Sequence, residues 1–258
     1  MAYTEKDTID MLEEAINSFE FLYNSDVINY SGKTSDKDKY YSEVCAEQLL
    51  KKLNNNNNIF GEIIPIRDKI YFQEDHLNGK VKINLENPRE ETTVKRIVFG
   101  NFNLGELGMP VDFQVPLNQQ QDGGRGKIDL LTFNKEKNCF YIVETKSIKS
   151  REQALRAILE IATYRKMIDL ERIKTEYPRV LRDYYNFELI KNVEISLKTA
   201  ILLFKGSNPA DQIMADDNLG EKLRALAQKL EVQVFILPPP ELPIRIKLED
   251  EIEGNYLI

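Results

Sequence analysis

The sequence predicts an α/β fold with a central sheet whose first three strands form a meander flanked by helices. Three observations predict it. Apolar residues recur at helical spacing near the N-terminus, three apolar segments follow one another with hairpin-length connections, and the C-terminal half alternates between strand and helix patterns. Because 258 residues can bury one sizeable core, we expect residues 1–258 to form a single domain, with its core at about 38–237.

The N-terminal third predicts two helices followed by β structure. Residues 5–23 and 38–53 each carry apolar residues at helical spacing. Between about 60 and 105, short apolar stretches recur between turn signals: "EIIPI", "KIYF", "KVKINL" and "KRIVFG". This spacing is typical of hairpins, so we expect a β-hairpin insertion at 60–105.

The middle of the chain predicts the meander. The strands are "VDFQVPL" (111–117), "KIDLLTF" (127–133) and "CFYIVETK" (139–146), joined by "NQQQDGGRG" and "NKEKN". Ser150 with Gln153 is a capping signature for a long helix that reaches Ile168. The rest predicts a strand at 196–204, a helix at 216–230 and a strand at 232–237. The Pro-rich, acidic segment 238–258 is expected to form a surface strap or a partner strand.

Composition and net charge indicate a globular protein and limit the ways in which it could bind nucleic acid. With 42% hydrophobic and 30% charged residues, the chain is typical of a globular protein, and no segment approaches the roughly 20 apolar residues of a membrane span. The N-terminal "MAYTEKDTID" is unlike a secretory signal, so we expect a cytoplasmic protein. Cys45 and Cys139 lie in apolar patterns, as expected for buried thiols in a reducing compartment. The net charge of −7 argues against bulk electrostatic coating of nucleic acid, but residues 144–182 are locally basic and could meet a phosphate-bearing partner.

Two carboxylates and a lysine mark the meander as a candidate site. Asp129 lies within one strand and Glu144 on the next, and the hairpin can bring the two carboxylates close together. Strand periodicity places Lys146 on the same face as Glu144. Two partly buried carboxylates repel unless a cation lies between them, and Mg²⁺ is a hard ion that prefers such oxygen ligands. A metal with a neighbouring ammonium suits phosphodiester hydrolysis.

"GKIDLL" followed by "YIVETKS" resembles the signature of the PD-(D/E)XK nuclease superfamily, the restriction-endonuclease-like fold. The resemblance covers roughly residues 38–204 and implies a mixed central sheet. It implies that Asp129, Glu144 and the Thr145 carbonyl hold Mg²⁺, with Mn²⁺ as a substitute, and that Lys146 positions the nucleophilic water. The superfamily's proline is absent, because Lys127 and Ile128 precede Asp129.

The flanking helices add candidates through the same resemblance. The helix before the meander often supplies a further acid in this superfamily, and either Glu43 or Glu47 could do so here; we favour Glu43. In the helix after the meander, some branches carry Gln-xxx-Tyr, and "EIATY" has Glu160 in place of the glutamine before Tyr164. Spacings of 3, 4 and 4 place Gln153, Arg156, Glu160 and Tyr164 in one polar stripe opposite the apolar face. The residues expected to contact DNA are Arg125, Lys127, Lys149, Arg151, Gln153 and Arg156.

The sequence therefore predicts a Mg²⁺-dependent deoxyribonuclease of restriction, defence or repair type. The alternative is an inactive nuclease-fold subunit that binds or scaffolds. "GGRGK" and "SGKT" fail as phosphate-binding loops, so no nucleotide cofactor is expected. The single histidine, His76, lies in a polar turn and is expected at the surface. A double-strand cutter could work as a homodimer, although no residue pattern demonstrates one.

Overall fold

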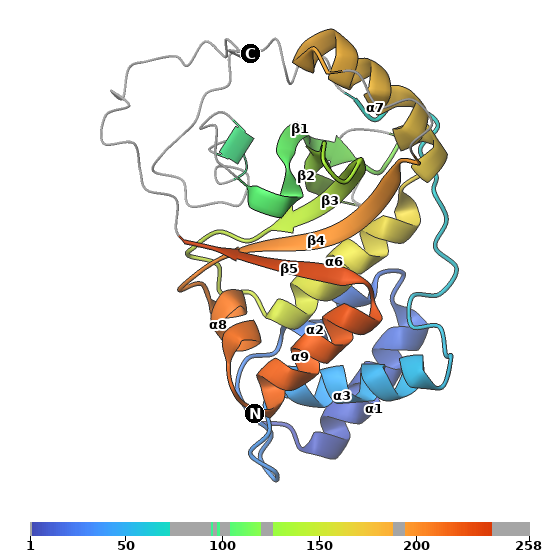
Figure 1. Ribbon diagram of the computed structural model, residues 1–258. Coiled ribbons are helices and arrows are strands. Elements are labelled where there is room, and N and C mark those ends of the chain that lie inside the picture. The colour runs from blue at the N-terminus through green and yellow to red at the C-terminus, as the bar shows by residue number, and fades with distance from the viewer. Residues whose placement is uncertain are drawn as a thin grey trace, which may run out of the picture.

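A five-stranded mixed sheet flanked by helices forms the described part of the chain, so the expected α/β class is confirmed (Figure 1). The computed structural model describes residues 2–72, 94, 97–98, 104–119, 126–187 and 194–238. Most of the expected insertion at 60–105, His76, Arg125 and residues 239–258 lie outside the described residues. In the part of the chain that is described, no helix has both the length and the apolar character needed to cross a bilayer.

The meander is present as the sequence predicts. It consists of β1 (Met109–Pro116), β2 (Lys127–Asn134) and β3 (Cys139–Thr145), paired antiparallel in that order. Next to it, β4 (Ser196–Phe204) pairs parallel with β3, and β5 (Val232–Leu237) pairs parallel with β4. The sheet order β1-β2-β3-β4-β5 therefore follows the sequence.

Both faces of the sheet are buried, and this explains the continuous apolar run in β3. Phe140 and Ile142 pack into the larger core cluster, on the side of the helices, whereas Tyr141 and Val143 pack into a smaller cluster on the opposite face. A short 3₁₀ helix, η2 (Gly105–Leu107), contributes to that smaller cluster. A strand buried on both faces needs apolar residues at successive positions rather than at alternate ones.

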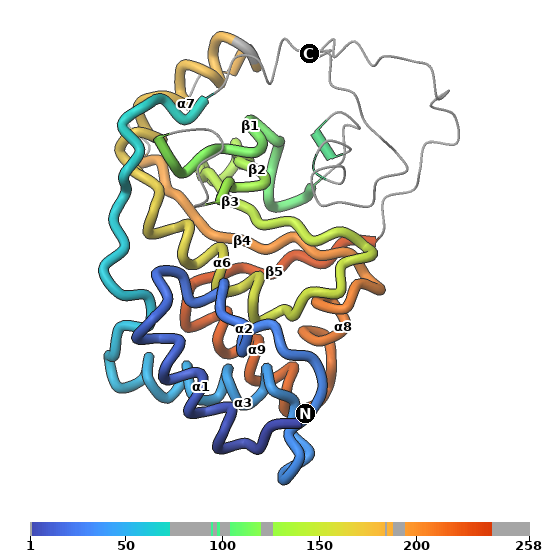
Figure 2. The backbone as a smooth tube through the Cα atoms, turned by 180° about the vertical axis from the view of Figure 1, so that it is seen from behind, coloured from blue at the N-terminus to red at the C-terminus, as the bar shows by residue number. Residues whose placement is uncertain are grey.

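Helices from both ends of the chain cover the face with the larger cluster. Figures 1 and 2 show α1, α3, α6 and α9 stacked on one side of the sheet. Thr4 and Asp7 form a reciprocal capping box that fixes the start of the first helix. The helices are α1 (Glu5–Ser18), η1 (Leu22–Asn24), α2 (Asp26–Asn29), α3 (Tyr41–Asn54), α6 (Ala154–Met167), α7 (Leu170–Tyr185), α8 (Asn208–Met214) and α9 (Asn218–Lys229).

Some expected elements differ from the structure. The helix expected from Ser150 begins at Ala154, because Gln153 is its N-cap and the Ser150 hydroxyl accepts from the Glu152 N–H instead. The expected strands at 62–66 and 69–72 do not form, and Ile97 and Val98 of the expected "KRIVFG" strand are helical. Ile64 and Ile70 of these stretches are exposed, whereas Tyr71, Phe72 and Ile97 are buried through tertiary contacts, and alternation within a few residues does not distinguish either case from sheet pairing.

Candidate active site

Asp129 and Glu144 lie opposite each other on β2 and β3. Leu130 faces Val143 in the register, so the next pair along the two strands is Asp129 and Glu144, with both side chains on one face. The Thr145 N–H donates to Asp129 Oδ2 at 2.9 Å, which holds that carboxylate at the end of β3. The carboxylates that the sequence brings together are therefore neighbours, and both are buried.

Gln114 is a member of the site that the sequence did not indicate. Its Nε2 donates to Asp129 Oδ1 at 3.0 Å from the neighbouring strand β1. Gln114 also has a φ of +51°, a left-handed backbone conformation that is unfavourable for a non-glycine residue. Such strain is found where surrounding structure fixes a side chain in place. Together with Thr145, Gln114 thus orients Asp129 through both of its oxygens.

Lys146 lies at the centre of a group of carboxylates. Its Nζ donates to Glu144 Oε1 at 2.8 Å and to Glu160 Oε2 at 3.3 Å, and it forms an ion pair of 2.7 Å with Glu152 Oε2. The contact with Glu144 confirms that residues 144 and 146 share one face. Glu160 comes from α6 and Glu152 from the segment before it, so Lys146 links the sheet to the helix layer.

Burial and charge shift the ionisation of this group. Burial raises the pKa of Glu144 well above its ordinary value, and the negative charges of Asp129 and Glu160 add to that effect. For Lys146, burial alone would lower the pKa, but the carboxylates around it outweigh burial and hold the pKa well above its ordinary value. Lys146 therefore remains an ammonium group at neutral pH.

The connected group contains more acids than bases. Arg156 Nε lies 3.8 Å from Glu152 Oε2 and 3.9 Å from Glu160 Oε2, too far for strong hydrogen bonds. With every group ionised, the connected side chains carry two excess negative charges. The acids are Asp129, Glu144, Glu152 and Glu160, and the bases are Lys146 and Arg156.

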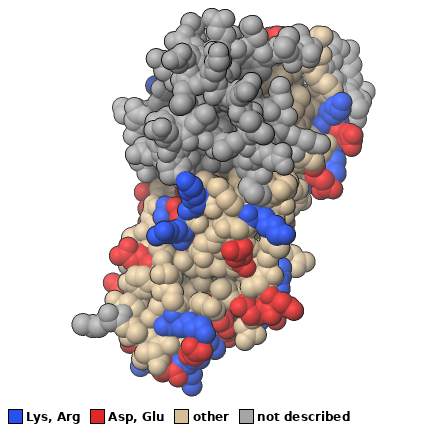
Figure 3. Space-filling model, turned by 90° about the vertical axis from the view of Figure 1, so that its left-hand side faces the viewer, with Lys and Arg blue, Asp and Glu red and all other residues tan. Residues whose placement is uncertain are grey.

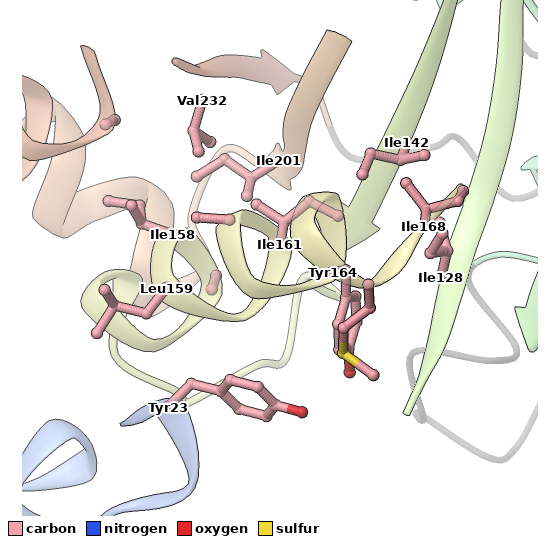
Figure 4. Close-up of a cluster of buried hydrophobic side chains, with 14 of the residues drawn as sticks. Tyr23, Ile128, Ile142, Ile158, Leu159, Ile161, Tyr164, Ile168, Ile201 and Val232 are labelled. Carbon is pink, nitrogen blue, oxygen red and sulfur yellow. The ribbon is translucent and has the colours of Figure 1, made fainter. Parts of the chain in front are cut away.

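Two tyrosines and a glycine border the carboxylates. Tyr164 donates to Glu160 Oε1 at 2.9 Å, and its ring meets that of Tyr23 edge-on with centroids 5.8 Å apart. Figure 4 shows both side chains within the buried cluster beside α6. Burial raises the pKa of Tyr23 to about 12, so it remains protonated at neutral pH. Gly126, with a φ of +85°, lies directly against the Tyr164 hydroxyl.

The polar stripe of α6 is not the exposed face of an amphipathic helix. Glu160 and Tyr164 are buried, and Gln153 is only 5% exposed. The Gln153 Oε1 accepts from Gln212 Nε2 of α8 at 2.7 Å, an arrangement that turns its amide toward the protein. Arg156 is partly exposed. Because helices also cover the outer side of α6, the stripe mainly makes contacts within the protein.

The other expected DNA contacts that are described lie closer to solvent. Lys149 and Arg151 are exposed in the segment between β3 and α6, and Lys127 is partly buried at the start of β2. The face drawn in Figure 3 carries Lys and Arg side chains interspersed with Asp and Glu. A phosphate contact is therefore sterically open to Lys149 and Arg151, a few residues from Lys146.

Glu43 and Glu47, the two candidate acids of α3, lie in different environments. Glu43 is 7% exposed, and it contributes to the electrostatic environment of Lys33. Glu47 forms ion pairs with Lys39 at 3.5 Å and Lys51 at 2.9 Å near the surface. Neither acid is among the three carboxylates that contact Lys146, so the prediction of Glu43 as a ligand stays a prediction.

The site offers a divalent cation two carboxylate ligands, Asp129 and Glu144, rather than a larger set. Within the described residues, no group of three or more Asp, Glu, His or Cys side chains is arranged to hold a metal ion. Mg²⁺, however, commonly uses one or two carboxylates and keeps several waters. The Thr145 hydroxyl has no hydrogen-bond partner among the described residues, but strand alternation directs it to the face of β3 opposite Glu144. Asp129 and Glu144 alone meet the minimum of one or two carboxylates.

Comparisons with protein-family models, with curated proteins and with solved structures find no match to this chain.

Proposed function

We propose that this chain is a Mg²⁺-dependent deoxyribonuclease with a restriction-endonuclease-like core. The observation that carries the proposal is the convergence of three residues at the end of the meander. Asp129 accepts from the Thr145 N–H, and Lys146 donates to Glu144 at 2.8 Å. A surface ion pair would not require burial of all three side chains, whereas a hydrolytic site does benefit from it.

The order of elements supports the proposed core. A helix (α3) precedes the antiparallel meander, α6 follows it, and β4 then joins the sheet parallel to β3. This is the order that the resemblance to the PD-(D/E)XK superfamily implies. Strand β4 also fixes the end of β3, because the Lys146 N–H donates to the Leu202 carbonyl at 3.0 Å. The active-site lysine is therefore held by its backbone as well as by its side chain.

Each residue of the site has a role in the proposed reaction. Asp129 and Glu144 supply the carboxylates for the cation, with Gln114 and Thr145 orienting Asp129. When bound, Mg²⁺ would neutralise charge on the scissile phosphate and promote ionisation of water. Lys146 provides a permanent ammonium group beside those carboxylates, suited to orienting the attacking water and to stabilising negative charge as it develops.

The exposed bases next to the site support a substrate that carries phosphate groups. Lys149 and Arg151 directly follow the strand that carries Glu144 and Lys146. Ammonium and guanidinium groups in this position can bind phosphates on either side of the scissile bond without reading sequence. DNA is the polymer that we propose, in accordance with the superfamily that the motif resembles.

Cleavage assays with point variants test the proposal. Plasmid and linear DNA are incubated with the protein in Mg²⁺ or Mn²⁺, and products are followed by gel electrophoresis. We expect Asp129→Asn and Lys146→Ala each to lower the cleavage rate at least about 100-fold, since each removes charge stabilisation of the transition state. Lys51→Ala, which removes an exposed lysine of α3, serves as the control and should cut at the wild-type rate. Cleavage that persists in both site variants would refute the assignment.

The second candidate is a nuclease-fold subunit that binds without cutting. It is favoured by one observation, the engagement of Lys146 Nζ by three carboxylates at once. An ammonium group held this firmly acts as a structural cross-link between sheet and helix. If no form of the protein cuts DNA in either metal while the wild type still binds DNA in a gel-shift assay, this second function replaces the first.

A further inference from the structure

The ammonium group of Lys146 lies within ion-pair distance of three carboxylates. The distances from Nζ are 2.8 Å to Glu144, 2.7 Å to Glu152 and 3.3 Å to Glu160. An ammonium group has three N–H donors, so the three carboxylates can occupy all of them. In the proposed reaction, the same group has to donate to the attacking water or to a phosphate oxygen. At least one carboxylate therefore gives up its contact when substrate binds.

Two of the three carboxylates are fixed by the elements that carry them. Glu144 belongs to β3 and Glu160 to α6, and their side chains are only 6% and 10% exposed. Each accepts a hydrogen bond from Lys146, and Glu160 also accepts one from the Tyr164 hydroxyl at 2.9 Å. Turning either side chain away would leave buried polar atoms without a partner, which is costly.

Glu152 is the carboxylate that can be released. It lies in the irregular segment between β3 and α6, and its side chain is 32% exposed. Although Oε2 is 2.7 Å from Lys146 Nζ, no group of the described residues meets this oxygen with hydrogen-bond geometry. The contact is an ion pair without the alignment of a hydrogen bond, so rotation of this side chain into solvent costs the least of the three.

The backbone around Glu152 is held by α8, so the release is a rotation of the side chain alone. The Asn208 side-chain amide donates to the Arg151 and Glu152 carbonyls at 3.4 and 2.9 Å. One turn later on α8, Gln212 Oε1 accepts from the Ala154 N–H at 2.9 Å. These bonds do not involve the Glu152 carboxylate. The connection between β3 and α6 therefore stays in place when that carboxylate leaves.

Arg156 offers a second donor at the position of the Glu152 carboxylate. Its Nε is buried and lacks a hydrogen-bond partner in the part of the chain that the structure describes. That atom lies 3.8 Å from Glu152 Oε2 and 3.9 Å from Glu160 Oε2. An anion that accepted from it would remove the cost of a buried donor without a partner. Lys146 and Arg156 thus face one anion position, which Glu152 fills.

We propose that Lys146 and Arg156 form a phosphate subsite and that the Glu152 carboxylate occupies this subsite until substrate binds. A phosphodiester, like a carboxylate, shares one negative charge between two oxygens and accepts hydrogen bonds from the same donors. The inference rests on the proposed nuclease function, to which it adds an internal competitor for the DNA backbone. Displacing Glu152 costs free energy, so the affinity for DNA is lower than the two bases alone would give.

Binding of a labelled DNA duplex to the full chain, measured by fluorescence anisotropy, tests this competition. Ca²⁺ replaces Mg²⁺ in the titrations, since it takes the same kind of oxygen ligands. We expect Glu152→Gln, which keeps the size of the side chain and removes its charge, to bind DNA at least about fivefold more tightly than the wild type. Glu152→Asp keeps the charge but is one methylene shorter, so it should gain part of this affinity.

The matched control is Glu221→Gln, which removes the same charge from an exposed position of α9. It should bind DNA within about twofold of the wild type, because exposed charges far from the site are screened. An equal gain in Glu221→Gln and Glu152→Gln would show that net charge alone acts, and would overturn the competition.

Inorganic phosphate tests the subsite without DNA. If Glu152→Gln binds phosphate about fivefold more tightly, excess phosphate in EDTA should raise its Tm by about 2–4 °C more than that of the wild type. Arg156→Gln in the Glu152→Gln protein should lose most of this gain, and full retention would remove Arg156 from the subsite. Differential scanning calorimetry measures the rise, and its transition also shows that each variant is folded.

The outcomes separate the subsite from the proposed function. Tighter binding of both ligands by a Glu152→Gln protein whose wild type never cuts DNA would keep the subsite and refute the nuclease. An affinity of Glu152→Gln for phosphate equal to or below that of the wild type would overturn the subsite, even if the wild type cuts DNA. A gain for inorganic phosphate without a gain for DNA would overturn DNA as the ligand that displaces Glu152.

Discussion

Gly126 lies where the loop after β1 returns to the sheet, directly against the hydroxyl of Tyr164. A Cβ atom at this position would overlap the tyrosine side chain. The φ of +85° adds backbone strain for any residue with a Cβ. Tyr164 donates to Glu160, which in turn contacts Lys146, so Gly126 is linked to the lysine through two side chains.

We therefore expect Gly126→Ala to displace Tyr164 and disturb the position of Lys146. Gly61→Ala is the matched control, since Gly61 also has a positive φ, of +64°, but nothing lies within 4 Å of a Cβ there. Gly126→Ala should lower the free energy of unfolding by roughly 1–3 kcal/mol more than Gly61→Ala. Urea denaturation measures the difference. Equal losses in the two variants would show that backbone strain alone acts at Gly126.

At the scale of single residues, strand periodicity predicted where some residues of the site lie but not others. Alternation along β3 placed Glu144 and Lys146 on one face, as their 2.8 Å contact confirms. Alternation could not indicate Gln114, whose role depends on a left-handed backbone conformation and on the pairing of β1 with β2. The burial of Glu160 could not be predicted from the sequence either, because it results from helices that pack onto α6 from distant parts of the chain.

At the scale of elements, α7 is joined to the edge strand β1 by two tyrosines. The Tyr177 hydroxyl donates to Asp112 Oδ2 at 2.8 Å, and both side chains are buried. Burial raises the pKa of Tyr177 well above its ordinary value, and the Asp112 charge adds to the shift. The Tyr185 hydroxyl donates to the Val111 carbonyl at 3.2 Å in a less buried position. These bonds fix α7 along the strand opposite β5.

We expect Tyr177→Phe to lower the free energy of unfolding by about 1–3 kcal/mol, because the buried Asp112 carboxylate loses the hydrogen bond that the tyrosine hydroxyl donates to it. Tyr185→Phe, on the same helix and directed at the same strand, should cost only about 0.5–1.5 kcal/mol because its acceptor lies near solvent. Urea denaturation of both variants at neutral pH measures this order. A cost for Tyr185→Phe equal to or larger than that for Tyr177→Phe would contradict it.

Elements with strong local patterns were predictable, whereas those shaped by distant contacts were not. Strands β2 and β3 match their expected ranges closely because each is a compact apolar run between turns. The stretch at 69–72 has a similar apolar run, but Tyr71 instead fills the core, and its hydroxyl accepts from the Asp169 N–H at 3.0 Å. Helix α7 was not predicted; it contains Pro178, which sequence rules associate with helix ends.

At the scale of the whole molecule, the buried acids should couple folding to a divalent cation. Two excess negative charges remain in the group around Lys146 when every member is ionised. Repulsion among buried carboxylates opposes folding, and a cation bound only by the folded state removes it. A stabilising effect of Mg²⁺ is therefore separable from any cutting of DNA.

We expect Mg²⁺ at about 100 times its Kd to stabilise the wild type by ~2.7 kcal/mol relative to EDTA. For a chain of this size, that corresponds to a rise in Tm of about 5–10 °C, measurable by differential scanning calorimetry. Asp129→Asn removes one of the two proposed ligands and should lose most of the rise. The same rise in the variant as in the wild type would place the Mg²⁺ effect elsewhere on the protein.

The sequential order of the strands has a consequence for synthesis on the ribosome. Each strand of the sheet lies beside the strand made just before it, so the sheet can assemble in the order in which the chain emerges. At every stage the growing edge belongs to the newest of the described strands. The last such edge is that of β5, which can pair with strands of other nascent chains for as long as it is exposed.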